Sequence, residues 1–234
     1  MIEPGSATLR NAIHLWSANL NQVEDASEAI LDEQERHRAA RYRMPDKRRH
    51  FVKSRYLMRR IVSRYVGEQA GSIRIAYHDK GKPYLPDHHL HFSISHSHDR
   101  WIIALSADTE IGVDIEKIEP RGGMEAIIRS YFHQDEQEKF SHMDPQQRLE
   151  AFYRHWTQME AFVKLHRIGL HARMNTIRQQ ERGLRFDGEP DSYVNCESYR
   201  MYPAYIVSIA TRGARPVMRM NWQDTESSNW GREE

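Results

Sequence analysis

The sequence predicts an α+β protein of two similar halves, in which mainly antiparallel strands pack with helices. Three observations support this fold class. Apolar residues recur at helical spacing in two long segments, 47–65 and 146–168. Apolar runs of strand length, separated by short polar links, lie between and after these segments. Residues 101–106 also resemble residues 205–210, 104 positions later, which indicates either a duplicated architecture or a chance likeness of two hairpins.

The first half is expected to open with helices. Residues 23–43 form the first helical region, with Asp25 or Ser27 as its cap, and a second helix follows at 47–65. The apolar stripe of this second helix consists of Phe51, Met58, Ile61, Val62 and Tyr65. Gly67 and Gly71 end the region.

Strands and further helices follow. Strands are predicted at 72–77, 90–94, 101–106 and 111–118. The links between the last three are so short that these strands should be antiparallel neighbours. In the second half, helices are predicted at 123–140 and 146–168, and strands around 184–186, 198–202, 204–210 and 216–220. The same offset of 104 places Met218 and Met220 where the first copy has Asp114 and Glu116.

The composition is that of a soluble globular protein, since 39% of the 234 residues are hydrophobic and 29% are charged. No apolar stretch approaches the ~20 residues that a membrane span needs, and the N-terminus lacks the basic start and apolar core of a secretory signal. The single cysteine, Cys196, allows no internal disulfide, so we expect a reducing cytoplasm and no membrane association. The polar tail after Gln223 is expected to be frayed.

A dense basic block runs from Arg36 to Arg64, with Asp46 as its only acid, although the net charge is only +1. Such a block attracts polyanions: nucleic acid, an anionic membrane or a ligand rich in phosphate. The alternative is a solvated basic face of a helix.

Asp114 and Glu116 form an acidic pair at the end of an apolar run. Alternate side chains of a strand share a face, so both carboxylates point to the side opposite Val113 and Ile115. Two acids on one face repel each other unless a cation or a shared proton lies between them, and paired oxygen ligands suit Mg²⁺. The alternative is two solvated acids on the outer face of an edge strand.

Cationic and hydrogen-bonding groups occur in two segments before this pair. Gly81-Lys82-Pro83 is a turn that presents a lysine from a rigid loop. Residues 92–98 supply serines and histidines, whose hydroxyls and imidazoles can hydrogen-bond to phosphate oxygens. A zinc site is a further interpretation of the local histidines, but the single cysteine and the oxygen-rich surroundings make it the weaker one. The histidines in question are His88, His89, His91, His96 and His98.

Glu160 and Lys164 lie four positions apart in the second long helix, so they share one face. They are either an ordinary surface pair or, because Trp156 and other apolar residues flank them, inward-facing groups. In the second case Glu160 is a third oxygen ligand beside the acidic strand. The carboxylates, lysines, Ser-His segment and arginine-rich helix together predict a Mg²⁺ site facing a polyphosphate.

These motifs resemble the 4′-phosphopantetheinyl transferases, specifically the longer, pseudodimeric class that serves nonribosomal peptide synthetases and siderophore pathways. The resemblance covers about residues 36–170, more than half of the chain. The matched elements, in the family's order, are GKP at Gly81-Lys82-Pro83, FNxSHS at 92–97, GVDIE at 112–116, WxxKEAxxK at 156–164 and a closing GL at Gly169-Leu170.

The resemblance implies a fold and a reaction. Residues 1–110 would form an N-terminal half that contacts the coenzyme A phosphates, and residues 111–234 a C-terminal half with the metal site, with the active site at their junction. A monomer would transfer the 4′-phosphopantetheine arm of coenzyme A to a serine of an apo acyl- or peptidyl-carrier protein. Adenosine 3′,5′-bisphosphate would be released. The expected setting is secondary metabolite biosynthesis, without nucleic acid as a partner.

The resemblance also implies residue roles. Asp114, Glu116 and Glu160 would coordinate Mg²⁺, or Mn²⁺, on the coenzyme A pyrophosphate. Glu160 would also act as the base toward the carrier serine, directly or through water, and Lys164 would contact the pyrophosphate or the pantetheine phosphate. The remaining contacts to coenzyme A would come from Lys82, Ser95, His96, Arg49 and Arg55.

Two positions depart from the family pattern. Met159 stands where the family usually has lysine, so an extra cation near the site would be absent. Ser93 replaces the family's asparagine, which would leave room for a water. Two other classes compete with the transferase: a Mg²⁺-dependent nuclease whose basic block binds DNA, and a non-catalytic module that captures coenzyme A or a carrier. The nuclease would carry its Glu and Lys two apart on a strand, and the module would be expected to lack a metal ligand.

Overall fold

The computed structural model describes residues 9–169 and 173–223, apart from the side chain of Gln146. Its helices are α1 (Glu33–Ala40), α2 (Pro45–Val66), α3 (Met124–Tyr131), α4 (Gln134–Ser141) and α5 (Pro145–His166), with 3₁₀ turns at η1 (Leu20–Gln22), η2 (Glu28–Ile30), η3 (Met174–Thr176) and η4 (Pro190–Ser192). Its strands are β1 (Ile13–Asn19), β2 (Ala76–Tyr77), β3 (Pro83–Tyr84), β4 (His91–Ser97), β5 (Arg100–Ser106), β6 (Ile111–Lys117), β7 (Ile177–Gln180), β8 (Gly183–Phe186), β9 (Val194–Met201), β10 (Tyr205–Thr211) and β11 (Val217–Asn221). Leu170 and the tail after Gln223, on which two sequence predictions fall, lie outside the described residues.

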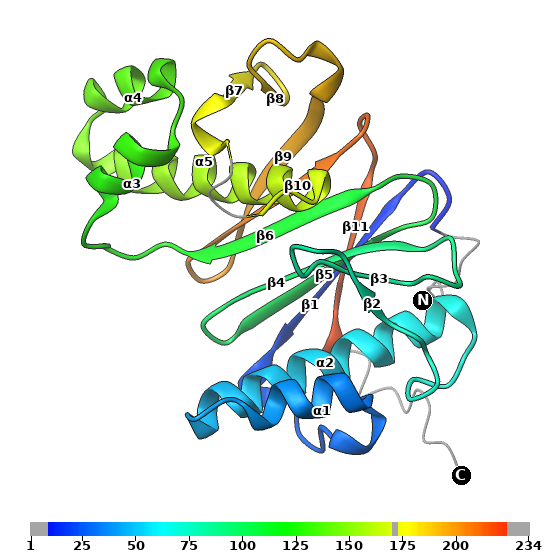
Figure 1. The fold of residues 1–234 in the computed structure, drawn as a ribbon. Helices are drawn as coiled ribbons and strands as arrows, with labels where there is room; N and C mark the ends of the chain where they lie inside the picture. The colour runs from blue at the N-terminus through cyan, green and yellow to red at the C-terminus, as the bar shows by residue number, and fades with distance from the viewer. Residues whose placement is uncertain (1–8, 170–172, 224–234) are drawn as a thin grey trace.

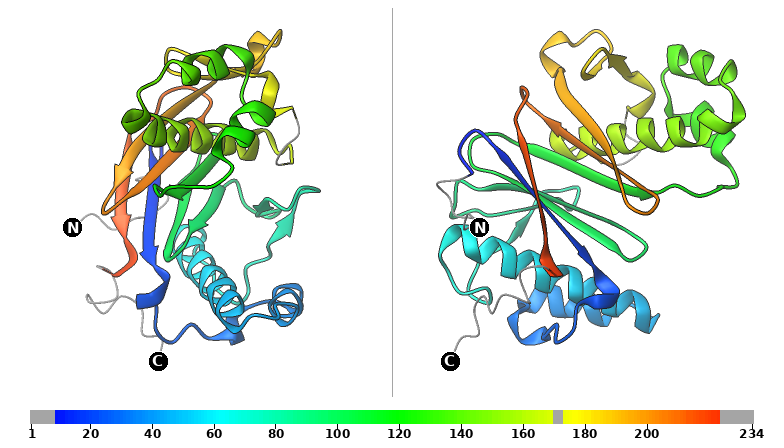
Figure 2. Two further views of the ribbon diagram at one scale, coloured as in Figure 1. Left: turned by 90° about the vertical axis from the view of Figure 1, so that its left-hand side faces the viewer. Right: turned by 180° about the vertical axis from the view of Figure 1, so that it is seen from behind.

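Two sheets form the centre of the molecule (Figure 1). One has the strand order β11-β1-β5-β4 and the other β6-β10-β9-β8-β7, while β2 and β3 form a small hairpin. Neighbouring strands are antiparallel, except that β1 and β11 are parallel. Seen from behind in Figure 2, β1 and β11 lie side by side although they come from opposite ends of the chain.

The two sheets lie face to face between two long helices, with α2 on one outer side and α5 on the other (Figures 1 and 2). Both helices span 22 residues. The cluster between the sheets is apolar and contains alternate residues of β1, β5, β6 and β10. The predicted α+β fold with two similar halves is therefore confirmed.

Helix α2 is built as its sequence predicts. Pro45 lies in its first turn, where a missing N–H costs nothing, and Gly67 closes it in the left-handed conformation at φ 74°. Most of its apolar stripe packs with β1, β4 and β5 in one buried cluster, whereas Phe51 packs with Leu31 and Ala39 in another. Asp32 caps helix α1 and forms a capping box with Glu35, while Ser27, one of the two expected caps, caps the preceding 3₁₀ turn η2.

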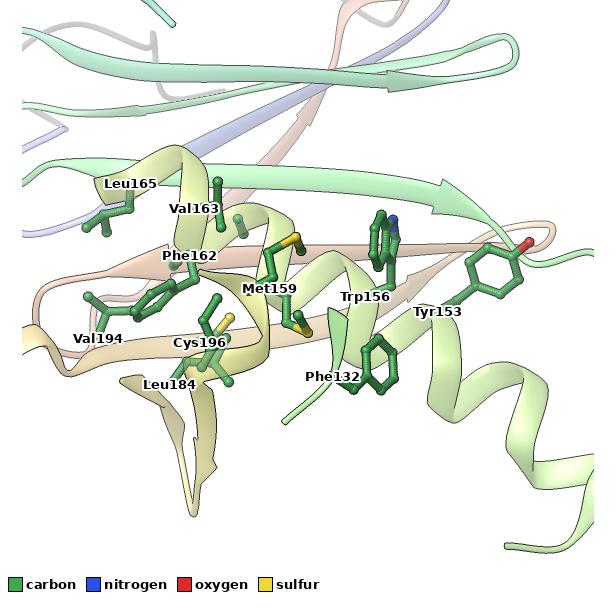
Figure 3. Packing of buried hydrophobic residues seen from close by; sticks show 14 of the residues in the cluster. Phe132, Tyr153, Trp156, Met159, Phe162, Val163, Leu165, Leu184, Val194 and Cys196 are labelled. Atoms are coloured by element: carbon green, nitrogen blue, oxygen red, sulfur yellow. The ribbon is translucent and has the colours of Figure 1, made fainter. Parts of the chain in front are cut away.

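Helix α5 covers the second sheet through a core that Figure 3 shows from close by. Trp156, Met159 and Phe162 pack there with residues of β8 and β9. Trp156 is buried, as its flanking apolar residues in the sequence predicted. Within residues 9–169 and 173–223, none of the helices combines the length and apolar character that a bilayer crossing needs.

Strand β6 corrects one expectation. It follows β5 after a short link, yet the two do not pair, because β6 leaves the first sheet and pairs with β10 in the second. β11 makes the opposite move and joins the first sheet beside β1. Met218 and Met220 therefore lie in a different sheet from the acidic pair, and the offset of 104 does not relate the two strands. β6 is left beside β4, at the junction between the sheets.

Candidate active site

Gly112 lets helix α5 approach β6 closely. A Cβ atom built on Gly112 would lie 1.9 Å from the carbonyl oxygen of Ala161 and 2.8 Å from the backbone nitrogen of Leu165. Because both of these atoms belong to the backbone of α5, no side-chain movement could make room. This contact holds the helix face that carries Glu160 and Lys164 against the acidic face of β6.

Lys164 connects the helix to the acidic strand. Its Nζ donates to Asp114 Oδ1 at 2.7 Å, to the carbonyl of Val113 at 3.0 Å and to Ser95 Oγ at 3.0 Å. The Ser95 hydroxyl also donates to Asp114 Oδ1 at 2.7 Å. The other oxygen, Asp114 Oδ2, is buried and has no hydrogen-bond partner. An anionic oxygen left unpaired in a buried place is costly unless a cation or donor binds it.

Glu116 and Glu160 both lie close enough to Asp114 for its charge to act on them. Burial raises the pKa of Glu160, and the charges of Asp114 and Glu116 raise it further. Burial and then Asp114 likewise raise the pKa of Glu116. Burial and the charge of Asp114 thus destabilise the anionic forms of Glu116 and Glu160, which is the electrostatic setting that a divalent cation relieves. The donor set and the unpaired Asp114 Oδ2 fit a hard cation.

The carboxylates do not yet converge as ligands. Among the described residues, no three His, Cys, Asp or Glu side chains are arranged as a metal-binding group. The Lys164 ammonium lies against Asp114 and compensates part of the negative charge. Glu160 therefore lies beside the acidic pair, as expected from the sequence, but in a looser arrangement than a bound ion requires.

A cationic cleft of about 220 Å³ adjoins this acidic group. Lys164 belongs to both, because it lines the cleft and binds Asp114. The other positively charged residues that line the cleft are Arg38, Arg55, Lys80, Lys82 and Arg167.

Two of these cations are held in place by their surroundings. Lys82 Nζ donates to the carbonyl of Ile111 at 2.7 Å, and burial followed by the charge of Arg167 lowers the pKa of Lys82 to about 7. The Arg55 guanidinium lies 5.0 Å from the ring centre of Phe51 and 5.7 Å from that of Tyr77. Burial lowers its pKa, and its Nε has no hydrogen-bond partner. The cleft therefore holds buried positive charge with unused donors.

His96 and Arg49 have other surroundings. The His96 ring is on the opposite face of β4 from Ser95, and burial and then Lys164 lower its pKa. Arg49 is 63% exposed, pairs with Asp46 and lines a separate groove of about 500 Å³. Of the predicted contacts to coenzyme A, the structure brings Lys82, Ser95, Lys164 and Arg55 toward one another and leaves Arg49 apart.

Arg38 and Arg167 line the cleft although sequence reasoning assigned them no role. Arg38 lies in the basic block, but nothing in the sequence distinguishes it from its neighbours. Its guanidinium lies 5.4 Å from the Phe51 ring, beside Arg55. Arg59 belongs to the same basic block but has a structural role. It is fully buried in ion pairs with Asp32 and Glu35, which join α1 to α2.

The two departures from the family pattern have structural explanations. Met159 is fully buried in the core between α5 and the second sheet (Figure 3), so this position does not face the acidic group. The Ser93 hydroxyl accepts a hydrogen bond from the Val113 N–H at 3.1 Å. It therefore reaches β6 directly, where the sequence analysis allowed room for a water.

Comparison with known proteins covers both halves. Residues 14–109 match the family described as 4′-phosphopantetheinyl transferase, N-terminal, and residues 110–209 match the 4′-phosphopantetheinyl transferase superfamily. The chain is 32% identical over 168 residues to 4′-phosphopantetheinyl transferase HetI of a Nostoc species, covering 69% of this chain and 71% of that protein. It is 31% identical over 161 residues to 4′-phosphopantetheinyl transferase Sfp of Bacillus subtilis, covering 65% and 69%. The chain therefore belongs to the 4′-phosphopantetheinyl transferase family and is an enzyme of that type.

Proposed function

We propose that the enzyme transfers the 4′-phosphopantetheine arm of coenzyme A to a serine of an apo acyl- or peptidyl-carrier protein, with Mg²⁺ bound and adenosine 3′,5′-bisphosphate released. The observation that carries this proposal is the position of Lys164, which links three crowded carboxylates to a cleft lined with cations. A polyphosphate that reaches from the cleft to the carboxylates would neutralise the positive charge of the cleft. It would also bind the same divalent ion as the carboxylates. The placement of Glu160 and Lys164 on a helix also favours the transferase over a nuclease.

Asp114, Glu116 and Glu160 would hold the ion. When bound, Mg²⁺ would neutralise charge on the pyrophosphate and stabilise the departing phosphate oxygen. Asp114 Oδ2 is the oxygen best suited to it, since Oδ1 already accepts from Ser95 and Lys164. Mn²⁺ has similar ligand preferences and is an alternative occupant.

The cleft residues would bind the remaining phosphates. Lys82 and Arg55 offer buried positive charge, and Arg38 and Arg167 extend it. Arginine suits phosphate because its planar donors bind two oxygens at once. Lys164 would contact the pyrophosphate nearest the carboxylates, with Ser95 beside it. His96, on the other face of β4, would contact the 3′-phosphate region.

Glu160 would take the proton of the carrier serine, directly or through a water. The serine oxygen then forms a bond to the phosphorus that carries pantetheine, and the bond from that phosphorus to the bridging oxygen breaks. Adenosine 3′,5′-bisphosphate leaves with the electron pair of that bond.

The organisation that we propose is a monomer with two halves, residues 1–110 and 111–234, and the active site at their junction. The first half would supply Lys82 and Arg55, and the second half the carboxylates and Lys164. We further propose a cytoplasmic location and a role in secondary metabolite biosynthesis. These assignments rest on the family resemblance and on the cleft lining, which combines residues of the first half with residues of α5 and the segment after it.

Mass spectrometry of a carrier protein tests the proposed function. After incubation with this enzyme, coenzyme A and Mg²⁺, an apo carrier should gain about 340 Da, the mass of the transferred arm, on one serine. Chelation of the metal with EDTA should abolish the gain, and a carrier whose acceptor serine is replaced by alanine serves as the control. An unchanged carrier mass with several acyl and peptidyl carriers would contradict the proposal.

Replacing Arg55 with glutamate should weaken the binding of coenzyme A by about 100-fold, because it places an anion in a cationic cleft. Arg49→Glu is the matched control, since both residues lie on α2 but Arg49 is outside the cleft. The affinity of the Arg49→Glu variant for coenzyme A should stay within about threefold of that of wild type. Calorimetry measures both, with circular dichroism to verify folding. Equal losses in the two variants would assign the effect to the overall charge of the helix.

Lys82 should make nucleotide binding depend on pH. With a pKa of about 7 it is mostly neutral at pH 8, and a phosphate bound beside it stabilises the charged form and raises that pKa. Binding of adenosine 3′,5′-bisphosphate at pH 8 should therefore take up close to one proton, and Lys82→Met should lose this uptake. Calorimetry in buffers of different ionisation enthalpy measures it. Heats that do not depend on the buffer for wild type would contradict the role of Lys82.

A further inference from the structure

Three serines of β4 face β6 across the junction of the two sheets. Ser93, Ser95 and Ser97 alternate along the strand and are all buried, so they share one face. Phe92 and Ile94, on the other face, pack in the cluster that contains α2. β4 and β6 belong to different sheets, and the serine hydroxyls supply hydrogen bonds between them.

Each strand carboxylate is held through one oxygen by one of these serines. Ser95 Oγ donates to Asp114 Oδ1 at 2.7 Å, and Ser97 Oγ donates to Glu116 Oε2 at 2.8 Å. A carboxylate fixed in this way keeps its second oxygen for another partner. The pattern repeats on two successive residues of the acidic face.

The direction of the Ser97 bond is set by the backbone. Ser97 Oγ accepts from the Lys117 N–H at 3.2 Å, and a hydroxyl has only one proton to donate. With a lone pair engaged by Lys117, that proton is directed at the charged Glu116 oxygen. The ring nitrogen Nδ1 of His98 lies farther away, at 3.4 Å, and the shorter bond to a carboxylate is the stronger one.

We propose that Ser97 is a positioning residue for the transfer reaction, which orients Glu116 toward the divalent ion from the opposite half of the protein. This inference rests on the proposed function, because it assigns Glu116 to the ion. Carboxylates that bind metals are themselves commonly held by hydrogen bonds, and loss of such a partner weakens metal affinity by about 10- to 100-fold. Ser97, in the first sheet, would thus orient Glu116, the metal ligand in the second sheet.

Ser93 provides a matched comparison. Its hydroxyl also reaches β6, where it accepts from the Val113 N–H at 3.1 Å, but it contacts a backbone amide and not a carboxylate. Ser93→Ala and Ser97→Ala each remove a hydroxyl from the same face of the same strand. If the serines only join the two strands, both variants should lose metal affinity to the same extent. If Ser97 orients Glu116, only Ser97→Ala should lose metal affinity.

The test is the affinity for Mn²⁺ alone, measured by electron paramagnetic resonance without coenzyme A or carrier. Ser97→Ala should bind Mn²⁺ about tenfold more weakly than wild type, and Ser97→Thr, which keeps the hydroxyl, should recover to within about threefold. Ser97→Cys is a second variant of similar size whose thiol is a weak donor, so the loss should match that of Ser97→Ala. Ser93→Ala should keep wild-type affinity although it loses a hydrogen bond.

Three results would overturn the proposal. Wild-type Mn²⁺ affinity in both Ser97→Ala and Ser97→Cys would remove the role of Ser97 and leave the proposed function intact. An equal loss of affinity in Ser93→Ala would reduce the serines to a structural link between strands. If wild type binds no Mn²⁺ alone, the same variants are compared with coenzyme A present, and absence of Mn²⁺ binding there too would overturn the metal site and the role of Ser97 with it.

Discussion

Replacing Asp114 with alanine is expected to lower the rate of phosphopantetheine transfer on the order of 10³-fold while the protein stays folded. The change removes the oxygen without a protein partner, Oδ2, and with it the central member of the proposed metal site. Folding should survive because Asp114 raises the pKa of both Glu116 and Glu160, so its loss relieves repulsion. Lys164 keeps its bonds to Ser95 and to the carbonyl of Val113.

Fluorescent coenzyme A and an apo carrier measure this loss under saturating Mg²⁺. Asp114→Asn, which preserves shape and removes charge, should lose a similar fraction of activity. Asp87→Ala is the control, since the Asp87 side chain is 57% exposed and forms a long contact with Arg74; it should transfer at the wild-type rate. Undiminished transfer by Asp114→Ala would refute the role of this carboxylate.

Gly112→Ala is expected to destabilise the protein by roughly 3 kcal/mol or more. The new methyl group would lie 1.9 Å from the Ala161 oxygen, so α5 must move away from β6. That movement would open the core of the second half and carry Glu160 and Lys164 away from Asp114. Residual folded protein should therefore also transfer poorly, even below its melting temperature.

Gly122→Ala separates this clash from the general effect of adding a methyl group. A Cβ atom on Gly122 meets nothing within 4 Å, so its free energy of unfolding should stay within about 0.5 kcal/mol of wild type. Chemical denaturation followed by circular dichroism compares the two variants. A Gly112→Ala protein with wild-type stability would mean that α5 and β6 are not in the close contact described.

Much of the fold could be predicted because its long helices carry a clear apolar period and short polar links separate many of its strands. The helical stripe of α2 and its glycine stop gave its bounds within two residues at the start and one at the end. β1 (Ile13–Asn19) was not predicted as a strand. Leu15 lies between the sheets and Trp16 lies against α2, so both faces of β1 are buried and no alternation marks it.

The exchange of β6 and β11 between the sheets could not be predicted from link lengths. A short link between two strands is also compatible with a strand that turns into another sheet, and the choice depends on packing across the whole molecule. Here the apolar residues Val113 and Ile115 fill the space between the sheets. This packing turns Asp114 and Glu116 toward α5, where Glu160 can approach them.

Residues of the candidate site could be predicted where a sequence motif identifies a single position. They could not be predicted where the sequence shows only a region rich in one kind of residue. Asp114, Glu116, Glu160 and Lys164 come from tight motifs, and the structure brings them to one place. The basic block contains many arginines in similar local sequence, so the sequence alone could not distinguish Arg49 from the arginines that line the cleft. The proposed role of Ser97 depends on a contact between two sheets, which the motif at 92–97 does not reveal.

A crystal structure with coenzyme A and Mn²⁺ would locate the divalent ion by its anomalous scattering. We expect one ion bound by Asp114, Glu116 and Glu160 and by the pyrophosphate, with the outer phosphates among Lys82, Arg55 and Arg38. An ion bound elsewhere, or bound at the pyrophosphate with Glu160 turned away from it, would refute the three-carboxylate metal site.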